Sequence, residues 1–136
     1  MNIGLTGSTG ILGSILKKKF KLKKKNLFFS NIENYNNVKN WVKKNNFDYI
    51  IHLAAIVPTK TVNNNKKKAL SVNYLGTKNL VNAINSYSKK KIWLFYSSTS
   101  HVYNFKKTKI IETDNKKPIS FYGKTKLKGE NYILKN

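Results

Sequence analysis

Residues 6–13 read TGSTGILG and lie between a short apolar run and a segment with helical spacing. In a turn that leads from a strand into a helix, Gly7 permits the tight bend and Gly10 lets the backbone approach a pyrophosphate. Gly13 lets the helix pack closely on the strand. The free N–H groups and the dipole of the helix N-terminus then hold phosphate oxygens. A glycine-rich turn alone also occurs in ordinary loops, but its place between strand and helix favours phosphate binding.

Short apolar runs alternate with longer segments of helical period along the rest of the chain. The run 49–55 is almost continuously apolar, as in a strand that is buried on both faces. We expect strands at 1–6, 27–29, 49–55 and 92–96, and helices at 10–20, 38–44, 69–87 and 121–134. This alternation predicts an α/β fold, a parallel sheet with helices on both faces.

The composition bounds the class of protein. The chain has 136 residues, which fits one domain, and it has no cysteine. A disulfide scaffold, a thiolate metal site and a cysteine nucleophile are therefore excluded, and we expect no metal site. The longest apolar run is too short to span a membrane, and the N-terminus does not have the pattern of a secretory signal. A cytoplasmic location is the simplest expectation.

The charge of the chain invites a nucleic-acid hypothesis. All 27 basic residues are lysines, against five acidic residues, for a formal net charge of +22. Recognition of bases and phosphates relies heavily on arginine, which is absent here. The lysines also lie in scattered runs and not along one element. Coding bias therefore explains the charge better than specific nucleic-acid binding, and we expect only weak, salt-sensitive adhesion to polyanions.

Two further motifs end predicted strands. Residues 52–55 read HLAA, and small side chains at the carboxyl end of a strand leave room for a ligand across the sheet. His52 itself is more simply explained as a structural histidine than as a catalytic base. Ser97, Ser98 and Thr99 follow the last predicted strand, where hydroxyl groups can donate to a substrate oxygen or simply form a polar strand exit.

The last motif is a tyrosine–lysine pair. Tyr122 and Lys126 are four residues apart, so on a helix they share one face. A nearby ammonium group favours the phenolate and lowers the tyrosine pKa from near 10, which makes tyrosine a usable acid or base. Such a spacing arises easily by chance in a lysine-rich chain.

Taken together and in order, TGSTGILG, HLAA, SST with HVY, and YGKTK resemble the motif set of the extended short-chain dehydrogenase/reductase family. The segment 118–130 is similar to the dTDP-4-dehydrorhamnose reductase type, whereas HLAA and SSTSHVY lean toward the epimerases. The resemblance covers essentially the whole chain. It implies a Rossmann-type fold and hydride transfer between a nicotinamide and a carbon of a nucleotide-sugar substrate.

The resemblance also implies roles for individual residues. Thr99 would bind the reacting sugar oxygen, Tyr122 would transfer the proton, and Lys126 would hold the nicotinamide ribose and lower the tyrosine pKa. Family members often form homodimers, so a homodimer is also expected. The implied dinucleotide contacts, besides Tyr122 and Lys126, are Gly7, Thr9, Gly10, Ile11, Leu12, Gly13, Asn31, Ile32, Leu53, Ala54, Ala55 and Ser97.

The sequence departs from the family pattern where the cofactor is selected. Asn31 takes the place of the acid that usually binds the ribose hydroxyls of NAD, and no acid follows until Glu33. No arginine is available for the 2′-phosphate of NADP, although lysines could serve. The sequence leaves NAD and NADP open, with a slight lean to NADP.

The length is the other departure, because family members are roughly twice this size. We expect residues 1–136 to be an incomplete NAD(P)-binding Rossmann domain that lacks the last strands and the substrate-binding part. Such a chain would have little activity alone. Two other hypotheses remain: a stand-alone dinucleotide-binding module that acts through a partner, and a basic nucleic-acid-associated protein.

Overall fold

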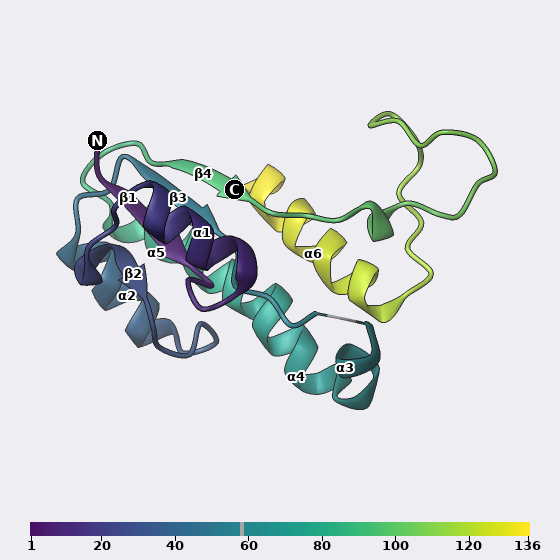
Figure 1. Ribbon diagram of the computed structural model, residues 1–136, viewed down its shortest axis with the longest axis horizontal. Helices are drawn as coiled ribbons and strands as arrows, with labels where there is room; N and C mark the ends of the chain where they lie inside the picture. The colour runs from purple at the N-terminus through teal and green to yellow at the C-terminus, as the bar shows by residue number, and fades with distance from the viewer. Residues whose placement is uncertain (58) are drawn as a thin grey trace.

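The computed structural model describes residues 1–57 and 59–136, and Figure 1 shows its layered α/β arrangement. Four parallel strands form one sheet in the order β2-β1-β3-β4. The strands are β1 (Ile3–Thr6), β2 (Leu27–Phe28), β3 (Tyr49–His52) and β4 (Trp93–Tyr96). The main helices are α1 (Ile11–Lys19), α2 (Tyr35–Lys44), α3 (Thr59–Asn64), α4 (Lys66–Leu70), α5 (Gly76–Tyr87) and α6 (Phe121–Lys135). The predicted parallel α/β fold is confirmed.

The register of the sheet brings the carboxyl ends of three strands to one level. Thr6 of β1 pairs with His52 of β3, and His52 pairs with Tyr96 of β4. Every crossover in such a sheet runs over a face, so the loops that follow these strands all open at the same edge. The turn at 7–10 and the segments after His52 and Tyr96 therefore meet there.

Side chains fix where two of the helices begin. The Asn34 side chain accepts a hydrogen bond from the backbone N–H of Asn37 (3.2 Å) at the start of α2. The Ser120 hydroxyl does the same for the N–H of Gly123 (3.0 Å) at the start of α6. Both are favoured N-cap residues because they satisfy a donor that the helix itself leaves free. Ser120 thereby sets the position of the first turn of α6.

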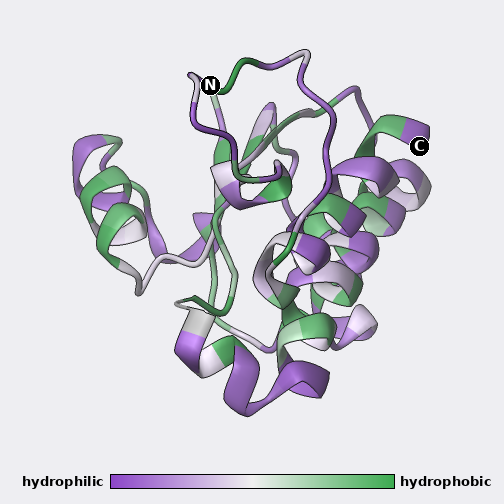
Figure 2. Ribbon diagram, turned by 90° about the vertical axis from the view of Figure 1, so that its right-hand side faces the viewer, coloured by the Kyte–Doolittle hydropathy of each residue, from purple (hydrophilic) through white to green (hydrophobic). Residues whose placement is uncertain are grey.

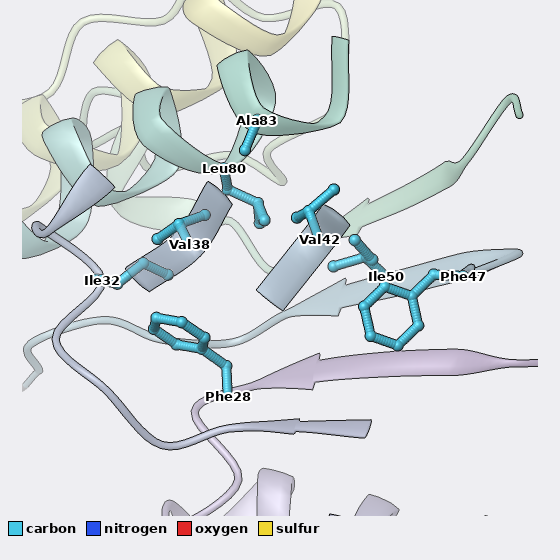
Figure 3. Packing of buried hydrophobic residues seen from close by; sticks show 8 residues of the cluster. All are labelled: Phe28, Ile32, Val38, Val42, Phe47, Ile50, Leu80 and Ala83. Carbon is cyan, nitrogen blue, oxygen red and sulfur yellow. The ribbon is translucent and has the colours of Figure 1, made fainter. Parts of the chain in front are cut away.

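The main core lies between the sheet and the pair α2 and α5. Figure 3 shows side chains from the β2 exit, α2, the β3 region and α5 converging there. Phe47, Ile50 and Leu80 are fully buried. The cluster consists of Phe28, Ile32, Val38, Val42, Phe47, Ile50, Leu80 and Ala83. This packing gives the turn at 7–10 and the neighbouring loops a rigid base.

The opposite face of the sheet is covered by α1 only in part, and here one prediction was wrong. Figure 2 shows α1 standing alone on one side of the sheet. Because α1 packs on β1, it leaves β3 and β4 uncovered, and Tyr49 (40%), Trp93 (61%) and Phe95 (44%) remain exposed. The segment 49–55 is therefore not buried on both faces, and its strand ends at His52.

The long helix expected at 69–87 is a composite. Helix α4 passes into one π-helical stretch, η2 (Ser71–Leu75), which continues directly into α5. A π-bulge of this kind is frequent at functional sites, and here it carries the buried Asn73. Helix α3 and the short 3₁₀ helices η1 (Lys24–Asn26) and η3 (Ser100–Val102) were not predicted. Within the described ranges, none of the helices is long and apolar enough to cross a membrane.

Candidate functional site

A cavity of about 380 Å³ opens at the carboxyl edge of β1, β2 and β3. This volume lies in the usual range for small-molecule sites. Its walls are the glycine turn, the loop after β2 and the segment after β3. Eight of the implied dinucleotide contacts line it: Gly7, Thr9, Gly10, Asn31, Ile32, Leu53, Ala54 and Ala55.

The three glycines of the turn have different physical roles. Gly7 has a φ of +72°, and a Cβ there would lie 2.7 Å from the backbone N of Ala54. A Cβ on Gly13 would lie only 2.1 Å from the carbonyl oxygen of Gly7, so α1 packs directly under the turn. At Gly10 the nearest atom to such a Cβ is 3.5 Å away, which is ordinary contact. Within the protein Gly10 is thus not required by packing, and it lines the cavity.

Ser8 adds a polar group that the sequence reasoning did not single out. Its side chain is buried, and its hydroxyl has no hydrogen-bond partner among the described residues. A buried hydroxyl without a partner costs about 1–3 kcal/mol. Ser8 lines the cavity in the same turn that leads into α1. A phosphate oxygen would satisfy the hydroxyl, so the turn fits a pyrophosphate group.

The loop after β2 is held against α5. Ile32 is buried, and a Cβ on Gly76 would lie 2.5 Å from its side chain. The side-chain amide of Asn79 donates to the carbonyl oxygens of Ile32 (3.1 Å) and Glu33 (3.0 Å). Asn31 remains exposed beside the cavity. The loop is therefore preorganised to present Asn31 and Glu33 to a ligand.

His52 is a structural residue, as predicted. It is fully buried, with Nδ1 2.7 Å from the Thr6 hydroxyl and Nε2 3.0 Å from the Thr77 hydroxyl. The Thr77 hydroxyl donates to the carbonyl oxygen of Asn73, so it accepts from Nε2–H, and Nδ1 accepts from Thr6. Burial lowers the pKa of His52 to about 3, with the charge of Lys126 adding to the effect. The imidazole is therefore neutral and fully paired.

The side chain of Asn73 connects the wall of the cavity to helix α6. Its side-chain oxygen accepts from the N–H of Ile56 (2.7 Å), and its amide donates to the Thr125 hydroxyl (3.1 Å). Ile56 belongs to the wall of the cavity, whereas Thr125 belongs to α6. Asn73 is buried and paired on both sides. It therefore fixes α6 relative to the cavity.

A second group of side chains lies where β4 ends and α6 begins. The Thr99 side chain accepts a hydrogen bond from the N–H of His101 (3.2 Å) at the start of η3. The ring of His101 lies edge-on to Tyr122, with 5.8 Å between the ring centres. A Cβ on Gly123 would lie 2.1 Å from the carbonyl oxygen of His101, so α6 packs tightly on η3. This close approach brings Tyr122 and Thr99 together.

The two ionisable groups of this cluster are shifted mainly by burial. Burial raises the pKa of Tyr122, and its hydrogen bond with the Thr99 side chain opposes that rise. Burial lowers the pKa of Lys126 to about 8, with the carboxylate of Glu130 opposing. Perturbed groups at a cleft are frequent at functional sites. The predicted residues Thr99, Tyr122 and Lys126 therefore share one region of the sheet edge.

The effect of Lys126 on the tyrosine pKa stays a prediction. Lys126 is not among the groups that shift the pKa of Tyr122. Its ammonium lies over the ring of Tyr96, 3.9 Å from the ring centre. Sharing a helix face brings two residues to the same side, but the lysine head follows the nearest aromatic face.

Some of the implied dinucleotide contacts lie elsewhere. Ile11 (85% exposed), Leu12 and Gly13 do not line the cavity, and Gly13 acts through its packing under Gly7. Ser97 lies beyond β4, where its N–H donates to the carbonyl oxygen of His52 (3.3 Å). Lining residues that the sequence reasoning missed include Ser8, Ser30, Glu33 and Lys68. Ser8 lay inside the recognised motif, while Lys68 is brought in by a helix that was not expected to begin there.

The comparisons with known proteins agree with this arrangement. A family model described as "RmlD substrate binding domain" matches residues 1–136. The chain belongs to this family. Among solved structures it is similar to a dTDP-4-dehydrorhamnose reductase from Clostridium acetobutylicum, with 29% identity and a TM-score of 0.84 over 99% of this chain and 49% of that one.

Two further solved structures are similar to this member of the RmlD family. A dTDP-4-dehydrorhamnose reductase from Bacillus anthracis in complex with NADP shares 26% identity, with a TM-score of 0.82 over 98% of this chain and 49% of that one. A UDP-glucose 4-epimerase from Thermus thermophilus in complex with NAD has a TM-score of 0.81 at 22% identity, over 98% and 50% of the two chains, which shows the fold alone. The chain spans about half the length of these structures. No curated protein sequence matches it.

Proposed function

We propose that this chain carries the dinucleotide site and the acid–base residues of a NAD(P)-dependent sugar-nucleotide oxidoreductase. The single observation that carries the proposal is the shared sheet edge. A cavity lined by the glycine turn opens there, and Asn73 bonds both to Ile56 in its wall and to Thr125 of α6, the helix that carries Tyr122 and Lys126. Membership of the RmlD family and similarity to dTDP-4-dehydrorhamnose reductases support it.

The residues of the cavity would bind a dinucleotide in two groups, one for the pyrophosphate and one for the adenosine. The backbone of the turn and the Ser8 hydroxyl would hold the pyrophosphate at the N-terminus of α1. The segment 53–55 and the loop after β2 would enclose the adenosine. The bound dinucleotide would supply or accept the hydride. Lys126, at the far end of the same edge, would hold the nicotinamide ribose.

Tyr122 would transfer the proton at the reacting sugar oxygen. Its phenol is half-buried at the start of α6, and the Thr99 side chain, which would also hold that oxygen, opposes the rise of its pKa. In the free chain burial keeps the phenol protonated. In that state Tyr122 is ready to donate its proton to an oxygen that gains electrons as a carbonyl is reduced. Reduction is the direction this state favours, and epimerisation or dehydration would use the same three residues.

The choice between NAD and NADP follows from the loop after β2. The replacement of an acid by Asn31 supports the lean to NADP, and the relative bound to NADP is consistent with it. We further propose that residues 1–136 form the dinucleotide-binding part, and that a nucleotide-sugar pocket needs residues outside this stretch. Homodimer formation and a cytoplasmic location stay predictions.

Titration of the purified chain with NADH and NADPH tests the proposal. We expect the nicotinamide fluorescence to change and the melting temperature to rise, because a ligand at 100 times its Kd stabilises the folded state by about 2.7 kcal/mol. Tripolyphosphate at equal charge concentration and moderate salt is the matched control for simple attraction to a chain of charge +22. If neither dinucleotide exceeds tripolyphosphate, the proposal is wrong.

A further inference from the structure

The carboxylate of Glu130 joins three segments that meet near the candidate acid–base residues. Glu130 lies on α6, and its side chain is only 14% exposed. The Ser98 hydroxyl donates a hydrogen bond to Oε1 of Glu130, and the Lys116 ammonium lies 2.7 Å from Oε2. Each oxygen of the carboxylate therefore holds a different segment on α6, one just after β4 and one in the loop that leads into α6.

The contact with Lys116 anchors the loop between η3 and α6. Residues 104–117 form a wide loop (Figure 1). Within the described chain, the other side-chain hydrogen bonds and ion pairs of this loop stay inside it or reach Tyr103. The pKa of Lys116 is raised, mainly by its hydrogen bond with Glu130. Glu130 is therefore the polar anchor of this loop on α6.

The contact with Ser98 lies next to Thr99, the residue that acts on Tyr122. The Thr99 side chain opposes the rise of the Tyr122 pKa. On the far side of Thr99, the tight packing of η3 on Gly123 holds this segment against α6. On the near side, the hydrogen bond from Ser98 to Glu130 holds it. Because Glu130 and Tyr122 belong to the same helix, this bond fixes Thr99 relative to Tyr122.

We propose that Glu130 is a positioning residue, which holds Thr99 against Tyr122 through Ser98, an inference that rests on the roles given to Thr99 and Tyr122 in the proposed function. Glu130 does not line the dinucleotide cavity, so it acts on the reaction through the residues that handle the proton. A hydrogen bond to a carboxylate is stronger than one between neutral groups, which suits it to this role. Lys116 balances the charge of a carboxylate that is largely shielded from water.

The sign of the change in the tyrosine pKa separates positioning from a direct effect of charge. Loss of a nearby carboxylate favours the phenolate, so by itself it lowers the pKa of Tyr122. Displacement of Thr99 removes the group that opposes the rise of this pKa, so it raises the pKa. The two roles of Glu130 therefore predict opposite shifts when its side chain is removed.

Phenol titrations of a set of variants test the inference. The ionisation of Tyr122 is followed as the absorbance at 295 nm of each protein minus that of the same protein with Tyr122→Phe. We expect Glu130→Ala and Ser98→Ala to raise the midpoint by about 0.5–1 pH unit, as Thr99→Val does. Glu130→Gln keeps an acceptor oxygen for Ser98 and should keep the wild-type midpoint. Glu112→Ala removes the same carboxylate from an exposed position and should leave the midpoint unchanged.

Circular dichroism over the same pH range establishes that each protein is folded while its tyrosine titrates, and Ser98→Ala carries the test if Glu130→Ala does not fold. An unchanged midpoint in either folded alanine variant overturns the inference. So does a midpoint that falls in both Glu130 variants, or one that rises as far in Glu130→Gln as in Glu130→Ala. Titration with NADH and NADPH separates the two proposals. If wild type binds neither dinucleotide, the proposed function fails, whereas binding with unmoved midpoints rejects only the positioning role.

Discussion

The Nζ atom of Lys126 lies 3.9 Å from the centre of the Tyr96 ring. The lysine is 2% exposed, and the aromatic face is the group that partly replaces its hydration. Gly129, one turn further along α6, makes room for this arrangement, because a Cβ there would lie 2.5 Å from the Tyr96 hydroxyl. Without a bound dinucleotide, the Lys126 ammonium is thus poorly solvated at the place where the nicotinamide ribose is expected.

This burial should appear as a dependence of stability on pH. Burial lowers the folded-state pKa of Lys126 to about 8, whereas the unfolded value is near 10.5. Between these values the unfolded chain binds more protons, so the free energy of unfolding rises with pH. Urea unfolding at pH 7.5 and 9.5 should show a rise that is larger in wild type than in Lys126→Met by about 1–2 kcal/mol. Equal rises in both proteins would contradict the assignment.

Lys124→Met is the matched control for this effect. Lys124 lies on α6 two residues earlier and is exposed, so its removal changes the net charge equally without a desolvated ammonium. The rise between the two pH values should therefore be the same in Lys124→Met as in wild type. A general relief of repulsion among the lysines would instead affect both variants alike.

His52 predicts a pH dependence of the same sign, but at acid pH. Its pKa is near 6.5 in an unfolded chain and about 3 in the folded one. Below pH 6.5 the unfolded chain takes up the proton first, so stability falls by about 1.4 kcal/mol for each pH unit down to the folded pKa. In His52→Phe this slope should disappear between pH 6.5 and 4.5. The variant should also be less stable at pH 7 by about 1–3 kcal/mol for each threonine hydroxyl left unpaired.

His101→Phe is the comparison for His52, because His101 is exposed. It should keep the acid slope of wild type. The stability of wild type, His52→Phe and His101→Phe is measured at each pH by urea unfolding monitored by circular dichroism. If His52→Phe keeps the full slope, another group is responsible for it.

The glycines of the turn predict a separation of folding from binding. Gly10→Ala adds a methyl group whose nearest neighbour is 3.5 Å away, so it should cost only about 1 kcal/mol as a poorer N-cap. Because Gly10 lines the cavity at the start of α1, where the proposed pyrophosphate would lie, NADH affinity should fall at least tenfold. Gly13→Ala meets the Gly7 carbonyl oxygen at 2.1 Å and should cost about 3 kcal/mol or more. A Gly10→Ala protein that is stable and binds NADH normally would remove the turn from the proposed site.

The sequence was a good guide where local rules determine the structure. The turn at Gly7 needs a positive φ and close packing, and both leave a glycine signature that can be read directly. The order of strands and helices followed from period alone, which made the parallel sheet predictable. His52 was correctly assigned to structure, because a lone histidine at a strand end usually finds partners inside.

The sequence was a poor guide where the outcome depends on the neighbours of a segment. Trp93 and Phe95 look like core residues, yet they are exposed because α1 covers β1 and not β4. Lys126 was expected to act on Tyr122, but the competing ring of Tyr96 comes from a different strand. The pairing of Glu33 with Lys68 likewise joins two segments 35 residues apart, which no spacing rule predicts.

Tyr122 gives the prediction closest to the proposed chemistry. Burial raises its pKa from the usual value near 10 and the Thr99 side chain opposes this, so the phenolate should form only above pH 10, and at still higher pH in Thr99→Val. The difference in absorbance at 295 nm between wild type and Tyr122→Phe, followed against pH, reports this single group. Tyr122→Phe should leave NADH affinity within about twofold and, in any form of the protein that turns over a nucleotide sugar, lower turnover by about 10²–10⁴-fold. Tyr87→Phe, at the end of α5, is the control that should change neither quantity. A phenolate that appears well below pH 10 in the free chain, or turnover that survives Tyr122→Phe, would reject Tyr122 as the proton donor.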